Sequence, residues 1–164
     1  MSDMSYITAF ILILVFVCVY AAQALRKNSY RRRLRRSGLD KIGDGRDFEE
    51  YVAALLKSNG YRHIRTTPKS GDYGADIIAE KDGLSYAIQC KLYAKAVGVK
   101  AVQEIFSAMQ YYGCDAAIVA TNSRFSRNAV NLAESTGTVL WDRDSLVDMA
   151  AKKNIAKKSM RDVE

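Results

Sequence analysis

The fold of this chain is decided by one stretch, which reads Gly71-Asp72-Tyr73-Gly74-Ala75-Asp76-Ile77-Ile78-Ala79-Glu80-Lys81-Asp82-Gly83-Leu84-Ser85-Tyr86-Ala87-Ile88-Gln89-Cys90-Lys91. The Lys-Asp-Gly segment at 81–83 separates two apolar runs, a pattern that is typical of a β-hairpin. We therefore expect one strand over residues 75–80 and a second over residues 84–92.

Three polar side chains stand out in this apolar hairpin. Side chains alternate across a strand, so Gln89 and Lys91 share one face while Cys90 points to the opposite, core-facing side. Asp76 opens the neighbouring strand, and hairpin pairing is expected to bring its carboxylate close to Gln89 and Lys91. A carboxylate, an amide oxygen and an ammonium in this arrangement can hold a divalent metal and a water against a phosphodiester. In the alternative interpretation, Asp76 only caps a turn and Lys91 only reaches solvent from the sheet edge.

The charge of the chain is concentrated in one short run. The net charge is +7, and the run at residues 26–36 holds seven of the 25 basic residues and no acid. From residue 37 onward, 18 basic and 17 acidic residues nearly cancel. A length of 164 residues fits one domain of roughly 110–120 residues plus appendages. A nearly neutral domain argues against tight nonspecific binding of nucleic acid without a metal.

Cysteine and histidine usage excludes several kinds of site. The three cysteines are an odd number and show no Cys-x-x-Cys spacing, so we expect reduced thiols in an intracellular domain. His63 is the single histidine, which leaves little basis for a zinc site or a Ser-His triad.

Residues 6–25 carry no charge, and about 20 apolar residues are enough to span a bilayer as a helix. The positive charges follow this segment, which predicts an N-terminus outside and the remainder in the cytoplasm of a single-pass inner-membrane protein. The rival interpretation is a cleaved signal peptide, because Ala22-Gln23-Ala24 resembles a cleavage site, although a signal peptide carries its positive charge before the apolar stretch. The basic run at 26–36 would set this topology, and contact with anionic lipid or DNA phosphates are further roles for it.

The remaining pattern predicts an α/β domain with a mixed sheet flanked by helices. The expected elements are a helix at 47–58, a strand at 61–67, the hairpin, a helix at 99–112, a strand at 115–121, a helix at 126–136, a strand at 138–141 and a helix at 144–153. The apolar strand at 115–121 follows a crossover helix, which indicates parallel pairing.

These residues resemble the catalytic domain of the Mrr-like type IV restriction endonucleases, a branch of the PD-(D/E)xK nuclease superfamily. The resemblance covers residues 45–146 and is carried by Ser70-Gly71-Asp72-Tyr73-Gly74-Ala75-Asp76, Gln89-Cys90-Lys91, Phe48-Glu49, Ser58-Asn59-Gly60-Tyr61, Val97-Gly98, Val102-Gln103-Glu104, Ala120-Thr121-Asn122 and Phe125-Ser126. Two departures matter. The wider superfamily usually has an acid where Gln89 stands, although the Mrr-like branch has glutamine there, and a hydrophobic segment replaces the DNA-recognition module often fused to such domains.

The resemblance implies a restriction-endonuclease-like fold and a Mg²⁺-dependent DNA endonuclease, with Mn²⁺ as a substitute metal. Asp76 would be the main metal ligand, joined by Gln89 and the backbone carbonyl of Cys90. Lys91 would orient the attacking water or stabilise charge on the phosphate. Glu49 would hold a metal-bound water, or it would be only a first-turn acid favoured by the helix dipole.

Together with the apolar segment and the basic run, the resemblance divides the chain into a membrane anchor at 1–25, a juxtamembrane linker at 26–44, the nuclease domain at 45–151 and a basic tail at 152–164. Weaker candidates for DNA contact are Lys69, Lys95, Arg124 and Arg127, and Asp72 is either a turn residue or a second acid of the site. A homodimer is compatible with this scheme. Two other functions stay open: a membrane-tethered nucleic-acid-binding protein with a degenerate nuclease fold, and a junction-resolving nuclease.

Overall fold

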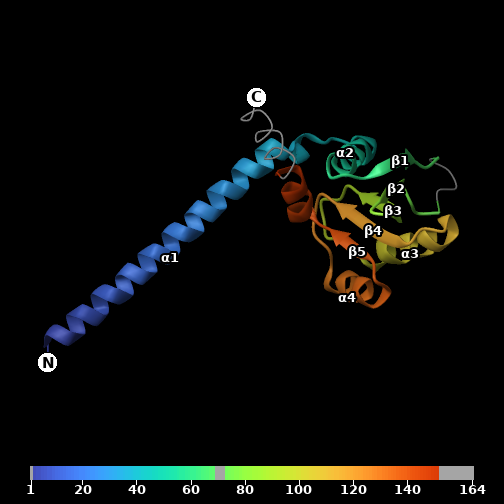
Figure 1. Ribbon diagram of the computed structural model, residues 1–164. Coiled ribbons are helices and arrows are strands. Elements are labelled where there is room, and N and C mark those ends of the chain that lie inside the picture. Colours follow the sequence, from blue (N-terminus) through green and yellow to red (C-terminus); the bar gives the residue numbers. More distant parts are fainter. Residues whose placement is uncertain (1, 69–72, 152–164) are drawn as a thin grey trace.

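The computed structural model describes residues 2–68 and 73–151, and within the first helix it describes side chains only at residues 11–26, 29 and 37. Its elements are α1 (Ser2–Ser37), the 3₁₀-helix η1 (Leu39–Lys41), α2 (Gly45–Ser58), β1 (Arg62–Thr66), β2 (Ile77–Lys81), β3 (Leu84–Lys91), α3 (Val99–Tyr112), β4 (Ala116–Thr121), α4 (Arg127–Thr136) and β5 (Val139–Trp141) (Figure 1). Residues 143–151 form a further helical segment. The predicted tail at 152–164 lies outside the described residues.

The five strands form one mixed sheet in sequence order, β1-β2-β3-β4-β5. The first three strands pair antiparallel, whereas β4 and β5 each pair parallel to the strand before them. The predicted hairpin is confirmed: Lys81 pairs with Leu84. The two residues between them have positive φ, 52° at Asp82 and 80° at Gly83, as a type I′ turn requires. The predicted mixed α/β sheet and the parallel pairing of β4 are likewise confirmed.

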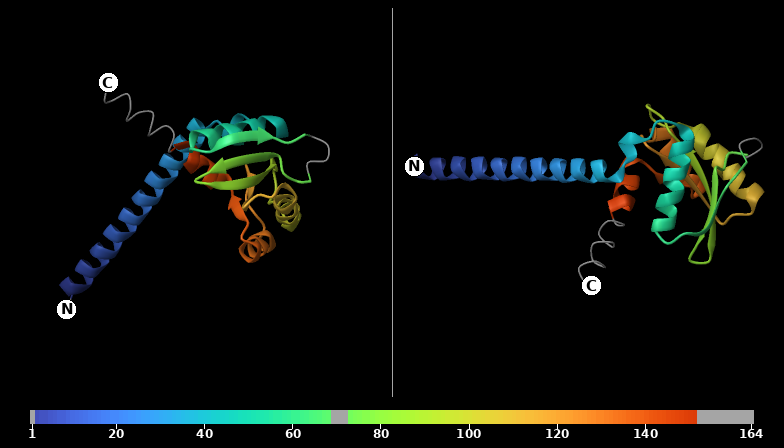
Figure 2. Two further views of the ribbon diagram at one scale, coloured as in Figure 1. Left: turned by 45° about the vertical axis from the view of Figure 1, so that its right-hand side comes forward. Right: turned by 90° about the horizontal axis from the view of Figure 1, so that it is seen from above.

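Helices cover both faces of the sheet (Figure 2). On one face, Phe48 and Val52 of α2 and Leu146 of the last helical segment pack against Ile88 and Ile118. On the other face, α3 and α4 pack on the sheet through a second set of buried residues that includes Ile105, Val102 and Ala129. Because both faces are covered, β4 can be apolar along nearly its whole length.

Helix α2 begins where the sequence supplies a cap. The Asp44 carboxylate accepts the Asp47 N–H at 2.8 Å, which satisfies one of the unpaired donors of the first turn. The side chains of Phe48, Val52, Leu55 and Leu56 form an apolar stripe on this helix, and all four are buried. This packing holds α2 against the sheet.

The segment expected as a linker at 26–44 is largely ordered structure. Helix α1 continues through the basic run to Ser37, and Gly38 ends it with a φ of 77°. Leu39 is only 3% exposed within the core cluster that contains Phe48. Asp40 pairs with Arg143 from the last helical segment. An apolar side chain and an ion pair therefore hold residues 38–41 against the domain.

Helix α1 extends away from the α/β domain (Figure 1). Large apolar side chains from Ile11 to Tyr20 are exposed along it. Within the part of the chain that the structure describes, no helix has both the length and the apolar character needed to cross a membrane. The predicted span at residues 6–25 is therefore not supported by the structure.

Candidate active site

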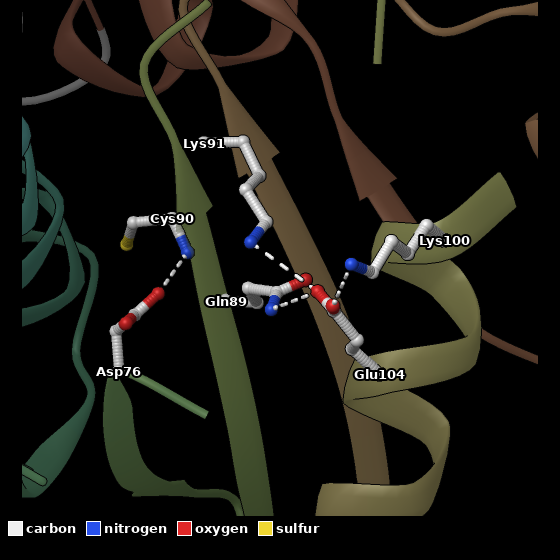
Figure 3. Close-up of polar contacts among 6 residues, drawn as sticks. All are labelled: Asp76, Gln89, Cys90, Lys91, Lys100 and Glu104. Atoms are coloured by element: carbon white, nitrogen blue, oxygen red, sulfur yellow. Dashed lines mark hydrogen bonds and ion pairs between the residues drawn. The ribbon is translucent and has the colours of Figure 1, made fainter. Parts of the chain in front are cut away.

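The hairpin places Asp76 next to the end of β3. Ile77 pairs with Ile88 across the hairpin, so Asp76 stands just before β2 and opposite the last residues of β3. Its N–H donates to the Ile88 carbonyl at 2.8 Å. Its Oδ2 accepts the Cys90 N–H at 2.6 Å (Figure 3). The carboxylate is thus fixed beside the backbone between Gln89 and Lys91.

Lys91 and Gln89 both contact an acid that the sequence had not singled out as a site residue, Glu104 of α3. The Lys91 Nζ lies 3.3 Å from Glu104 Oε2. The Gln89 Nε2 donates to the same oxygen at 3.1 Å. Lys100, one turn earlier on α3, places its Nζ 3.6 Å from Glu104 Oε1. Figure 3 shows these side chains converging on Glu104 from β3 and α3.

These contacts keep Glu104 ionised. Burial raises the pKa of its carboxyl, but the hydrogen bond from Gln89 and the positive charges of Lys91 and Lys100 outweigh burial and leave the pKa below its usual range. One sequence signal could have identified Glu104. It stands inside the apolar stripe of α3, between Ala101 and Ala108, where an acid needs a partner across the interface.

The amide oxygen of Gln89 has no hydrogen-bond partner among the described residues. Gln89 is only 2% exposed, and its Oε1 is one of the few buried side-chain atoms left unsatisfied. A buried amide oxygen without a partner costs about 1–3 kcal/mol, so such an atom calls for a ligand. The Gln89 Oε1 is therefore a ready oxygen donor for a cation.

Glu49 of α2 joins the site from the other side of β3. Burial raises the pKa of the Cys90 thiol well above its usual value, and the negative charges of Asp76 and Glu49 raise it further against the opposing charge of Lys91. The charges of Asp76 and Glu49 therefore both affect the Cys90 thiol at the end of β3. Glu50 is exposed and pairs within α2 with Arg46 at 3.6 Å, which leaves Glu49 as the glutamate that faces the site.

The donor set suits a hard cation held by few protein ligands. No group of three or more His, Cys, Asp or Glu side chains able to hold a metal exists within residues 2–68 and 73–151. The Asp76 carboxylate and the Gln89 Oε1 are oxygen donors, and Mg²⁺ commonly binds through one or two protein groups while it keeps several waters. The residues present therefore fit Mg²⁺. The Cys90 carbonyl stays a predicted ligand, and Asp72 lies outside the described residues.

A pocket of about 600 Å³ lies near the candidate site, at the carboxyl ends of the parallel strands. It is lined by Tyr93, Ala94, Lys95, Ala96, Asn122, Ser123, Arg124, Asp142, Arg143 and Asp144. The structure thus brings together two predicted DNA contacts, Lys95 and Arg124. Arg127 begins α4 and does not line this pocket, and Lys69 lies outside the described residues. A second hollow around the hairpin turn, at the opposite end of β3, contains none of the predicted site residues.

Known proteins resemble this chain in sequence and in fold. Residues 39–150 match the family model Mrr_cat, described as a restriction endonuclease. No curated protein matches the chain.

Three solved structures are similar. A protein of unknown function, AF1548, is 25% identical over 57% of this chain and 55% of its own, with a TM-score of 0.50. The DNA modification-dependent restriction endonuclease AspBHI is 18% identical over 82% of this chain and 40% of its own, with a TM-score of 0.55. MspJI, solved with a 27-mer oligonucleotide, is 17% identical over 81% and 30%, with a TM-score of 0.48.

The match therefore spans 55% or less of each of these three proteins. The likeness to AspBHI concerns the fold alone. The family model, in contrast, covers more than half of this chain and includes every residue of the site at the end of β3. The resemblance found in the sequence is thus confirmed: the chain belongs to the restriction endonuclease family, and its α/β domain is a nuclease domain.

Proposed function

We propose that this chain is a Mg²⁺-dependent DNA endonuclease whose α1 helix attaches it to a membrane. The observation that supports the catalytic part is the placement of three groups along the last residues of β3: the Asp76 carboxylate on the Cys90 N–H, the buried Gln89 Oε1 that has no hydrogen-bond partner among the described residues, and the Lys91 ammonium beside Glu104. This arrangement occurs in a domain of a nuclease family.

Each residue of the site has a separate task in this proposal. The Asp76 carboxylate and the Gln89 Oε1 would hold Mg²⁺, which when bound supplies Lewis acidity toward a phosphate and a more acidic water. Glu49 would orient a water beside the reacting phosphate. Lys91 would stabilise the negative charge that develops on the phosphate, an effect that typically contributes about a hundredfold or more in rate.

DNA contact is assigned to the pocket beyond Lys91. Lys95 and Arg124 would neutralise phosphates on one side of the cleaved bond, and Arg127 would add a positive charge near the N-terminus of α4. Because the domain is nearly neutral, few phosphates should be neutralised. We therefore expect binding with a shallow dependence on salt.

Membrane attachment rests on α1. Residues 6–25 carry no charge, seven basic residues follow them, and the apolar side chains from Ile11 to Tyr20 are exposed. In this proposal the N-terminus lies outside and the nuclease domain in the cytoplasm, with anionic lipid contacting residues 26–36. A reporter fused after Glu164 should be active only in the cytoplasm. Periplasmic activity, or a mature chain that begins near Leu25, would instead support a signal peptide.

The catalytic proposal is tested with the full chain, purified in detergent, on supercoiled plasmid and on a four-way junction, each with and without Mg²⁺. Methylated and unmethylated plasmid should be compared in parallel. The parent should nick DNA only with Mg²⁺ or Mn²⁺. Asp76→Ala should lose both metal affinity and cleavage, whereas Lys91→Ala should keep metal affinity and lose about a hundredfold or more in turnover.

Three outcomes would contradict parts of this proposal. If both variants fold and cleave like the parent, the assignment fails at these positions. If the parent binds DNA but cuts nothing with either metal, the domain is a nucleic-acid-binding module. Cleavage confined to the four-way junction would make the chain a junction-resolving nuclease.

A further inference from the structure

We propose that Glu104 is the positioning residue of this site: its carboxylate orients the Gln89 amide so that Oε1 faces the metal position, and it holds Lys91 on the same side. This inference rests on the proposed function. It explains how a glutamine can occupy a position where the wider superfamily uses an acid.

The hydrogen-bonding chemistry of the amide carries the first step. The Gln89 Nε2 donates to Glu104 Oε2 at 3.1 Å, and an ionised carboxylate can only accept hydrogen bonds. Turning the amide over would place the Gln89 Oε1 against a carboxylate oxygen, acceptor against acceptor. Glu104 therefore selects one orientation of the amide, and in that orientation Oε1 is buried and has no partner among the described residues.

The position of Lys91 carries the second step. Its Nζ lies 3.3 Å from the same Glu104 Oε2, and its side chain is only 23% exposed. A single carboxylate oxygen thus holds both the ammonium and the amide, and the two groups keep a fixed relation to each other. Lys100 contributes less, because its side chain is 87% exposed and its pairing with Glu104 Oε1 is solvated.

The backbone of Glu104 carries the third step, through Gly74. Gly74 has a φ of +95°, and a Cβ built there would lie 3.0 Å from the Glu104 Cβ and 3.2 Å from the Glu104 carbonyl oxygen. The chain that leads into Asp76 therefore rests directly on this turn of α3. Glu104 contacts the Asp76 segment through its backbone and the β3 residues through its side chain, so it ties the two halves of the site together.

The test is a double-mutant cycle between residues 104 and 89, read by calorimetric titration of the full chain with Mg²⁺ in the absence of DNA. Glu104→Ala should weaken Mg²⁺ binding by about tenfold or more, as is typical when a partner of a metal ligand is removed. In a Gln89→Glu background the same change should tighten binding. A carboxylate at position 89 presents an oxygen to the metal in either orientation, so it does not need Glu104 to orient it. Glu104→Ala also removes a negative charge beside that carboxylate.

Two further variants sharpen this test. Glu104→Gln is isosteric, and its amide oxygen can still accept from Gln89, so Mg²⁺ affinity should stay near that of the parent while turnover falls through the lost pairing with Lys91. Glu134→Ala removes an exposed glutamate from α4 and should change neither affinity nor turnover. If Glu104→Ala fails to fold, Glu104→Gln in both backgrounds replaces it. Mg²⁺ binding should then tighten only in the variant that also carries Gln89→Glu.

The inference is overturned if loss of Glu104 weakens Mg²⁺ binding equally in both backgrounds, or changes it in neither. The first result would mean that Glu104 only supports the fold, and the second that the amide orients itself. These failures are distinct from failure of the proposed function, in which the parent itself neither binds Mg²⁺ nor cuts DNA.

Discussion

Two glycines allow the contact between the Asp76 segment and α3 to be tested separately from backbone strain. Gly74 and Gly83 both have left-handed backbones, with φ of +95° and +80°. A Cβ at Gly83 would meet nothing within 4 Å, whereas at Gly74 it would meet the Cβ and backbone of Glu104. Gly83→Ala therefore measures the conformational cost alone, and Gly74→Ala measures that cost plus the close approach.

The expected magnitudes differ enough to measure. A residue with a Cβ in a left-handed conformation costs about 1–2 kcal/mol, which is the whole expected effect of Gly83→Ala. A Cβ added at Gly74 would lie 3.0 Å from the Glu104 Cβ and 3.2 Å from the Glu104 carbonyl oxygen. Both atoms are fixed by the backbone of α3, so they cannot move away as the end of a flexible side chain could. Such overpacking adds about 1–3 kcal/mol. We expect Gly74→Ala to lose roughly 2–5 kcal/mol of the free energy of unfolding by summing these two costs.

The assay is urea unfolding of the full chain, followed by fluorescence of Trp141, the single tryptophan, which packs edge-on against Tyr61. With a denaturant slope of about 1–3 kcal/mol per molar and an added overpacking cost of about 1–3 kcal/mol, the Gly74 variant should unfold roughly 1 M earlier than the Gly83 variant, within a range of about 0.3–3 M. Plasmid nicking should fall only for Gly74→Ala, because moving Glu104 disturbs Gln89 and Lys91. Equal midpoints and equal nicking for the two variants would refute this account of the site.

Three further predictions use other parts of the chain. Phe48→Ala should lower the free energy of unfolding by about 3–5 kcal/mol in the same assay, because this ring is fully buried between α2 and the sheet. Hydrogen bonds from Ser85 hold the pKa of Asp115 below its ordinary 3.8, so the stability they contribute is present above pH 3.8 and is lost as the pH falls through the lower, folded value. Asp115→Asn should thus be less stable than the parent at pH 7, and unfolding at pH 7 and at pH 3 should show the difference shrinking. Arg124→Ala should weaken DNA binding uniformly across sequences and reduce the slope of log affinity against log salt by about 1, as fluorescence anisotropy at several salt concentrations would show.

The features predicted from the sequence are those set by neighbouring residues. Asp82-Gly83 fixes the turn of the hairpin, and the alternation beyond it places Gln89 and Lys91 on one face. The stripe of α2 follows from helical periodicity, and the buried parallel strand β4 follows from its apolar run after a crossover helix. Each of these depends on contacts a few residues apart or on burial of a whole face. The family resemblance adds the identity of the domain.

The features that were missed depend on distant partners. Asp40 pairs with Arg143, 103 residues further on, and nothing local to either residue reveals it. In the sequence, Leu39 is one apolar residue in a polar segment, and only the structure shows the core cluster in which it packs. Glu104 is 15 residues from Gln89, across the turn from β3 to α3, and its contact depends on how α3 rotates against the sheet. Periodicity places Glu104 within an apolar stripe but does not show which side chain it meets.

The identity of residue 89 follows from the acid that faces it. Glu104 Oε2 lies 3.1 Å from the Gln89 amide nitrogen, so a glutamate at position 89 would set two carboxylates against each other in a largely buried place. Like charges at this separation raise the pKa of one member of the pair, and the added negative charge would then be partly lost to protonation. A glutamine avoids the repulsion, donates to Glu104 and still offers an oxygen to a cation. Residues 89 and 104 are therefore matched as a pair, and Gln89→Glu alone should bind Mg²⁺ more weakly than Gln89→Glu combined with Glu104→Gln.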